Sequence, residues 1–124
     1  MNTEQPLALL GGLTPSQFMK RHWQKKPLLV RNAIPGFVPC LDRAELVALA
    51  GQEGVESRLI VDSDKGWKMK HGPLAKRSLP PFSQKKWTFL VQGVDLHHDG
   101  VHALMQQFRF VPDARLDDVM ISYA

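Results

Sequence analysis

Apolar residues recur at helical spacing in three stretches of the chain, and each stretch begins with a capping signal. Residues 14–23 open with Thr-Pro-Ser-Gln, in which the hydroxyl and the glutamine can form a capping box around a proline at the first helical position. Residues 42–50 open with aspartate, carry glutamate three positions later, and are followed by glycines. Residues 99–108 carry apolar side chains three and four positions apart. We therefore predict three helices.

Strand-forming residues fill the intervals between these helices. Residues 28–31 (Leu-Leu-Val-Arg) predict a short strand. Residues 58–61 and 67–70 flank the turn-forming sequence Asp-Ser-Asp-Lys-Gly and are expected to form a hairpin. Residues 87–91 (Trp-Thr-Phe-Leu-Val) give the strongest strand signal, and their continuous apolar run predicts burial on both faces. A final strand is expected at residues 119–123.

This order of elements predicts an α+β fold in one domain. Residues 1–13 are expected to be a loose lead-in, and the proline-containing residues 72–84 an ordered loop. A chain of 124 residues with 44% hydrophobic side chains can bury one modest core. It has no apolar run of the roughly 20 residues that a membrane helix needs. No basic residue precedes the first apolar stretch and Cys40 is the only cysteine, so we expect a cytoplasmic, reduced protein with no membrane partner.

The positive charge of the chain is unevenly distributed. Between Lys65 and Val94 there is no acidic residue but there are seven cationic ones: Lys65, Lys68, Lys70, Lys76, Arg77, Lys85 and Lys86. A second cationic group lies in residues 20–26. Such stretches could bind an RNA-rich partner through its phosphates, or they could form a solvated face. The chain has no direct nucleic-acid motif with a glycine-aromatic signature, which favours the solvated face.

Three histidines near residue 100 form the most tempting metal candidate. His98 and His102 are four residues apart and would share one face of a helix, with Asp95 or Asp99 available as oxygen ligands. However, Asp99 and Gly100 mark the expected helix start, which places His98 outside the helical register. The same applies to His97, and an exposed polar cluster is the favoured interpretation.

The other polar candidates have ordinary structural interpretations. His22 is expected to pack beside aromatic neighbours on its helix, and His71 to lie on the surface after a strand. Asp117 and Asp118 are adjacent and point in different directions, so one of them is expected to cap a turn or to pair with Arg115 or Arg109. Cys40 has no neighbouring histidine and is taken as a structural thiol. Residue chemistry alone identifies no catalytic residue.

Five segments in a fixed order resemble the bacterial JmjC, or cupin 4, ribosomal oxygenases. The resemblance runs from about Leu13 to Ala124 and is carried by residues 18–30, 57–59, 67–73, 87–92 and 111–123. It implies that the strands form part of a double-stranded β-helix, as an incomplete barrel. It also implies that residues 14–124 are the N-terminal part of such a domain, cut short before the iron-binding motif.

The resemblance also implies an activity for the whole protein. Members use iron(II), 2-oxoglutarate and oxygen to hydroxylate a side chain of a ribosomal protein, and the nearest bacterial ones act on an arginine of the large-subunit protein uL16. Their His-x-Asp motif follows the Met-Ile-Ser strand, which here lies at the end of the sequence. His97-His98-Asp99 matches that motif formally but precedes the wrong strand. We therefore expect no catalytic, metal or cofactor ligand here, and a possible pocket wall at Met120, Ser122 and Tyr123.

Three functional hypotheses remain open at this point. The chain is the N-terminal portion of an iron(II)- and 2-oxoglutarate-dependent hydroxylase, inactive by itself. Alternatively, it is a small basic module that binds ribosomal protein or RNA without catalysis, or a defective gene product without activity. If the barrel is incomplete, the strands at residues 87–91 and 119–123 should lack pairing partners, and self-association of the chain is expected.

Overall fold

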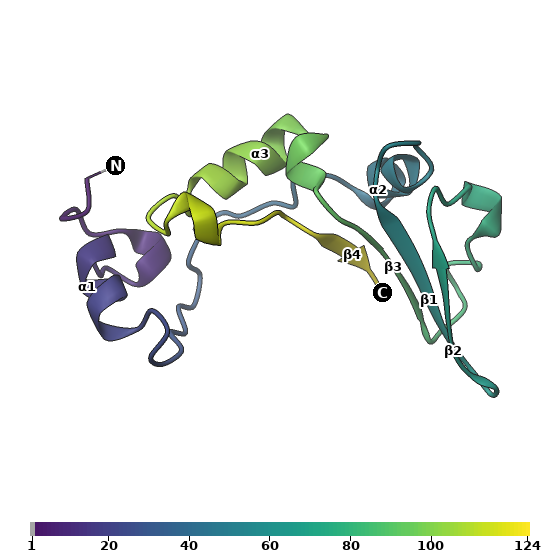
Figure 1. Ribbon diagram of the computed structural model, residues 1–124, viewed down its shortest axis with the longest axis horizontal. Helices are drawn as coiled ribbons and strands as arrows, with labels where there is room; N and C mark the ends of the chain where they lie inside the picture. The colour runs from purple at the N-terminus through teal and green to yellow at the C-terminus, as the bar shows by residue number, and fades with distance from the viewer. Residues whose placement is uncertain (1) are drawn as a thin grey trace.

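A computed structural model describes residues 2–124; Met1 lies outside the described residues. These residues form an α+β fold, as predicted, with a lobe around the first helix at one end and an antiparallel sheet at the other (Figure 1). The α-helices are α1 (Pro15–Arg21), α2 (Arg43–Ala50) and α3 (Asp99–Gln106). The strands are β1 (Ser57–Ser63), β2 (Gly66–His71), β3 (Trp87–Val91) and β4 (Ile121–Tyr123). None of the helices within residues 2–124 is long and apolar enough to cross a membrane.

Both predicted capping boxes are present. At α1 the Gln17 N–H donates to Thr14 Oγ1 at 3.1 Å, and the Thr14 N–H donates to Gln17 Oε1 at 3.0 Å. At α2 the Glu45 N–H donates to Asp42 Oδ1 at 2.8 Å, and the Asp42 N–H donates to Glu45 Oε1 at 3.3 Å. Each box satisfies two backbone donors that the helix itself leaves free, so the chain enters both helices at a defined residue.

The sheet has the strand order β2-β1-β3-β4, with every neighbouring pair antiparallel. The predicted β1–β2 hairpin is confirmed, and its turn is tight, with Ser63 opposite Gly66. Gly66 has a φ of +99°, a conformation that side chains with a Cβ rarely adopt. One register line crosses three strands from Leu59 to Phe89 to Tyr123. This line sets which side chains of β1, β3 and β4 share a face.

One face of the sheet packs against α2 and the loop of residues 72–84. Trp87, Phe89 and Val91 of β3 point into this core, whereas Thr88 and Leu90 between them are only half-buried. The expected burial of β3 on both faces was therefore wrong, because α2 and the loop cover only one of them. The buried core residues are Leu41, Leu46, Val47, Leu49, Ala50, Val55, Leu59, Leu74, Trp87, Phe89, Val91, Val94 and Val101.

Several expectations about the strands and the lead-in need correction. Residues 28–31 do not form a strand: they are not part of the sheet, and the Leu29 side chain is 77% exposed. The strand at residues 87–91 does not lack partners, because it pairs with β1 on one side and β4 on the other. The lead-in expected to be loose is ordered from Leu7, whose N–H donates to Leu13 O at 3.0 Å around a short 3-10 helix (Ala8–Leu10) that buries Leu10.

Candidate functional site

The face of the sheet opposite the core is the first candidate surface. Strand alternation places Arg58 and Ile60 of β1, Leu90 of β3 and Ser122 of β4 on this side, and we call it the open face. Arg58, Leu90 and Ser122 lie in one row across three strands. At the usual spacing between strands, Arg58 and Ser122 are about 10 Å apart across Leu90. A small polar ligand could therefore contact both ends of this row.

The three residues predicted as a pocket wall do not share a face. Tyr123 lies on the core side, where its ring centroid is 5.4 Å from that of Phe82 and 5.9 Å from that of Trp87. Its hydroxyl accepts a long hydrogen bond from Arg43 Nη1 at 3.5 Å. Ser122 is exposed on the open face, and Met120, just before β4, is also exposed. Only Ser122 and Met120 are free to contact a ligand, while Tyr123 serves packing.

Arg58 was not identified as a candidate from the sequence, although the Ser-Arg-Leu segment contains it. Its guanidinium donates to Gln92 Oε1 and lies 3.9 Å from a carboxylate oxygen of Glu56. Its Nε is buried and has no hydrogen-bond partner among residues 2–124. A buried donor without a partner costs free energy, and because this nitrogen is not exposed, an acceptor could reach it only if neighbouring groups moved. Sequence patterns carry no signal for such an unpaired donor, since it depends on which neighbours reach the guanidinium.

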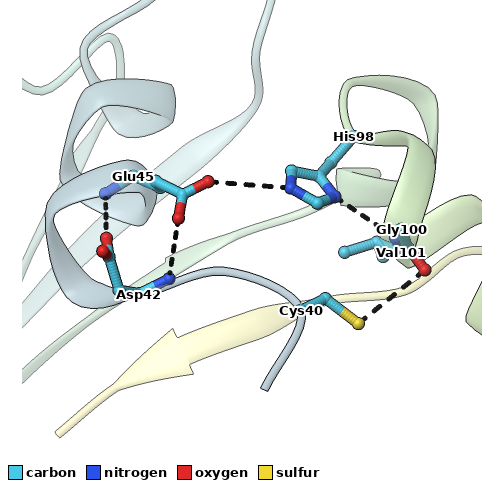
Figure 2. A network of polar contacts seen from close by, with 6 residues as sticks. All are labelled: Cys40, Asp42, Glu45, His98, Gly100 and Val101. Atoms are coloured by element: carbon cyan, nitrogen blue, oxygen red, sulfur yellow. Dashed lines mark hydrogen bonds and ion pairs between the residues drawn. The ribbon is translucent and has the colours of Figure 1, made fainter. Parts of the chain in front are cut away.

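The histidine cluster links two helix starts. His98 is the N-cap of α3, as its position outside the helical register predicted, and its Nδ1 accepts the Val101 N–H at 3.3 Å. In the neutral ring the hydrogen therefore lies on Nε2, which faces Glu45 Oε2 at 3.7 Å (Figure 2). Glu45 belongs to the capping box of α2, so one imidazole connects the beginnings of α2 and α3. Beside it the Cys40 thiol donates to Gly100 O at 3.7 Å.

This arrangement uses the histidines for local structure. His102 lies on α3, and its Nε2 is 3.1 Å from the Gln106 side-chain nitrogen. His97 ends a 3-10 helix (Val94–Leu96) and is exposed. Within residues 2–124, no three His, Cys, Asp or Glu side chains come together as a metal ion would require. The donor set that the structure describes does not fit an iron centre.

The remaining polar candidates also hold the fold together. The Val119 N–H donates to Asp95 Oδ1 at 2.9 Å, and the Gly93 N–H donates to Asp118 Oδ2 at 2.7 Å. These two bonds attach the end of β3 to the segment that enters β4, which agrees with the expected turn-capping role for one of the adjacent aspartates. Arg109 pairs with Asp113 at 2.8 Å and not with Asp117 or Asp118.

Two histidines outside this cluster lie as the sequence indicated. The His22 ring stacks on Phe18 with centroids 6.0 Å apart, which confirms the expected packing on the first helix. His71 is exposed at the end of β2, opposite Arg58 in the hairpin register. Neither histidine is placed beside a second group with which it could perform acid-base chemistry in residues 2–124.

Comparisons with known proteins find similar sequences and structures among ribosomal oxygenases. No protein-family model matches the chain. The ribosomal protein uL16 3-hydroxylase of Escherichia coli (strain K12) is 38% identical over 107 residues, which are 86% of this chain and 28% of that protein. The chain is homologous to one part of the ribosomal oxygenases. A probable ribosomal oxygenase of Haemophilus influenzae is 35% identical over 113 residues, or 90% of this chain and 28% of its own length.

Solved structures of a ribosomal oxygenase share the same fold. The ribosomal oxygenase YcfD from Escherichia coli matches with a TM-score of 0.78 and 38% identity, over 89% of this chain and 30% of that one. Its complex with cobalt and 2-oxoglutarate matches equally well, with 37% identity over 88% of this chain and 30% of that one. The resemblance to JmjC ribosomal oxygenases is thereby confirmed. The chain spans less than a third of the length of these relatives.

Proposed function

We propose that this chain forms the α1 lobe and part of the sheet of an iron(II)- and 2-oxoglutarate-dependent oxygenase that hydroxylates an arginine of the large-subunit ribosomal protein uL16. The observation that carries this proposal is the match of 86% of the chain to a uL16 3-hydroxylase, together with the same fold in a ribosomal oxygenase solved with cobalt and 2-oxoglutarate. In this class of reaction iron(II) would activate dioxygen, which is the oxidant, and 2-oxoglutarate would be oxidised to succinate and carbon dioxide as one oxygen atom enters the substrate.

The part of the reaction that falls to these residues is structural and substrate-binding. We infer that the metal ligands lie in the part of the relatives' length that this chain does not cover, which is more than two thirds of it. The open face is the surface that these residues offer to such a partner segment, with the Arg58 guanidinium as its cation and Ser122 as its hydroxyl. By itself the chain is expected to be inactive.

A chimera tests the proposed activity. The matching stretch of the Escherichia coli uL16 3-hydroxylase is replaced by this chain, and uL16 is incubated with iron(II), 2-oxoglutarate and oxygen. One added oxygen atom on a uL16 arginine, measured by mass spectrometry, is the expected product. Thermal unfolding of the chimera provides the control for folding. A folded chimera that leaves uL16 unmodified would contradict the proposal.

Experiments on the chain alone test the proposal that it lacks the metal ligands. Titration with 2-oxoglutarate in the presence of iron(II) under nitrogen is expected to give no heat of binding by calorimetry. An iron-dependent, micromolar affinity for 2-oxoglutarate would show that residues 2–124 hold a complete site. That result would refute the assignment of the metal ligands to another segment.

A further inference from the structure

The net positive charge of the chain resides in one short segment. Residues 62–86 contain seven cationic side chains and two acidic ones, Asp62 and Asp64. The other 99 residues contain nine cationic and ten acidic side chains. The segment therefore carries a net charge of +5 against +4 for the whole chain. This concentration of charge lies on the β1–β2 hairpin and the loop that follows it, at the opposite end of the molecule from α1 (Figure 1).

A large aromatic ring is exposed in the middle of this charge. Trp67 of β2 is 76% exposed, and Met69 two positions along the same face is 56% exposed. The other face of β2 carries Lys68 and Lys70, and all six residues of the strand are exposed. An exposed tryptophan on an edge strand is costly to leave in water, because its indole offers a large apolar surface without a neighbour.

A groove beside Trp67 has the size of a single nucleobase with its sugar. Its volume is about 300 Å³, and it is lined by Ile60, Asp62, Trp67, Lys86, Trp87 and Thr88. Lys86 is held at its rim because its backbone oxygen accepts the Asp62 N–H at 2.9 Å. The groove thus combines an aromatic wall, one carboxylate acceptor and one ammonium group.

We propose that the β1–β2 hairpin binds single-stranded RNA, with a base stacked on Trp67 and the phosphates bound by Lys65 in the hairpin turn and Lys86 at the rim of the groove. Stacking on an exposed aromatic ring combined with a cationic track is the arrangement by which proteins bind single strands without base specificity. The Asp62 carboxylate can accept a hydrogen bond from an exocyclic amino group of the base. The net charge of the segment excludes a basic peptide as the preferred occupant. This activity goes beyond the proposed hydroxylation and does not depend on it.

The second cationic group supplies an internal control. Lys20, Arg21, Lys25 and Lys26 lie at the end of α1 and just beyond it, and their density of positive charge along the chain is higher than that of residues 62–86. The tryptophan in this region, Trp23, is half-buried and packs near the Phe18 ring, with centroids 6.5 Å apart. This group therefore has cations without a free stacking surface. Of the two cationic groups, only the one on the β1–β2 hairpin also has an exposed aromatic ring.

Fluorescence anisotropy with a labelled oligouridine of about 12 nucleotides tests the proposal on the chain as it exists. Trp67→Ala is expected to weaken binding by roughly tenfold and to leave the salt dependence unchanged, because stacking releases no counterions. The double variant Lys65→Ala/Lys86→Ala should lower the slope of log affinity against log salt by about 1.4, at about 0.7 for each phosphate that is no longer neutralised. The matched variant Lys25→Ala/Lys26→Ala removes the same charge and should leave both quantities near those of the unchanged protein.

Three results would overturn the assignment to this hairpin. The first is absence of RNA binding at about 50 mM salt, where phosphate attraction is strong. The second is an affinity of Trp67→Ala equal to that of the unchanged protein. The third is an equal loss of affinity in Lys25→Ala/Lys26→Ala and Lys65→Ala/Lys86→Ala, which would show that net charge alone is responsible. Circular dichroism of each variant separates these results from loss of folding, which the exposure of all four lysines and Trp67 makes a small effect.

Discussion

The contact between Gly72 and Ser57 offers a sharp test of how the hairpin is joined to the core. A Cβ placed on Gly72 would lie 1.9 Å from Ser57 Oγ and 3.2 Å from Ser57 Cβ. Ser57 is almost completely buried, and its hydroxyl donates to Ala50 O at 3.2 Å. The hydroxyl therefore cannot move aside without giving up its acceptor at the end of α2. Gly72→Ala must displace either this hydroxyl or the backbone that follows β2.

The expected destabilisation by Gly72→Ala combines the steric overpacking with the loss of the Ser57 hydrogen bond. Overpacking in a buried site costs about 1–3 kcal/mol, and loss of the Ser57 hydrogen bond adds about 1 kcal/mol. The smaller backbone entropy of alanine in the unfolded chain returns about 0.5 kcal/mol. We expect Gly72→Ala to lower the free energy of unfolding by about 1.5–3.5 kcal/mol. Ser57→Ala alone should cost only about 1 kcal/mol, because Ala50 O still accepts the Leu74 N–H at 2.6 Å.

A double-mutant cycle isolates the steric term. In the Ser57→Ala background the nearest atom to the new methyl group is the Cβ at 3.2 Å, so Gly72→Ala should cost about 1 kcal/mol or less. Urea unfolding followed by tryptophan fluorescence gives the four free energies, and equal m values confirm that the denatured states are comparable. If Gly72→Ala is equally destabilising in both backgrounds, the clash with the serine hydroxyl is not the cause and the reasoning fails.

The other predictions concern the buried core, the N-terminal cap of α2, the hydrogen bond between Gly93 and Asp118, and the aromatic ring of Tyr123. Phe89→Ala should lower the free energy of unfolding by about 3–5 kcal/mol in urea, since the ring is fully buried, and a loss below about 1 kcal/mol would contradict this packing. Asp42→Ala should cost about 1 kcal/mol through loss of the α2 cap, with Asp42→Asn close to the original. Asp118→Ala should speed hydrogen exchange at the Gly93 amide, which a purely solvated aspartate would not affect. Tyr123→Phe should change the melting temperature little, whereas Tyr123→Leu should lower it by several degrees, because the aromatic contacts stabilise more than the long bond to Arg43.

Local signals in the chain were sufficient for several elements. The capping boxes at Thr14 and Asp42 involve residues three positions apart, so their geometry depends on nothing distant. The β1–β2 hairpin follows from a turn sequence between two strand-forming runs, and the register of the turn around Gly66 is local as well. The position of His98 outside the α3 register also followed from its two following residues.

Long-range relations explain where the same signals were misleading. Leu-Leu-Val-Arg at residues 28–31 has strand-forming side chains but is not paired in the sheet, and propensity cannot show whether a neighbouring strand is available for pairing. The apolar run of β3 indicated two buried faces, yet α2 and the loop of residues 72–84 reach only one. The unpaired Nε of Arg58 depends on which side chains reach the guanidinium, and one of them, Gln92, is 34 residues away in the chain.

The sequence by itself determined the helix starts, the hairpin, the α+β class and the ordered resemblance to ribosomal oxygenases, because capping, turn chemistry and short motifs act between residues close in the chain. Only the tertiary structure decided which face each strand presents. Strand alternation assigns Tyr123 and Ser122 to opposite sides, but which side is covered depends on where α2 packs, some 70 residues earlier in the chain. The same packing leaves Trp67 exposed among the lysines. The exposed ring and these cations together form the candidate RNA-binding surface.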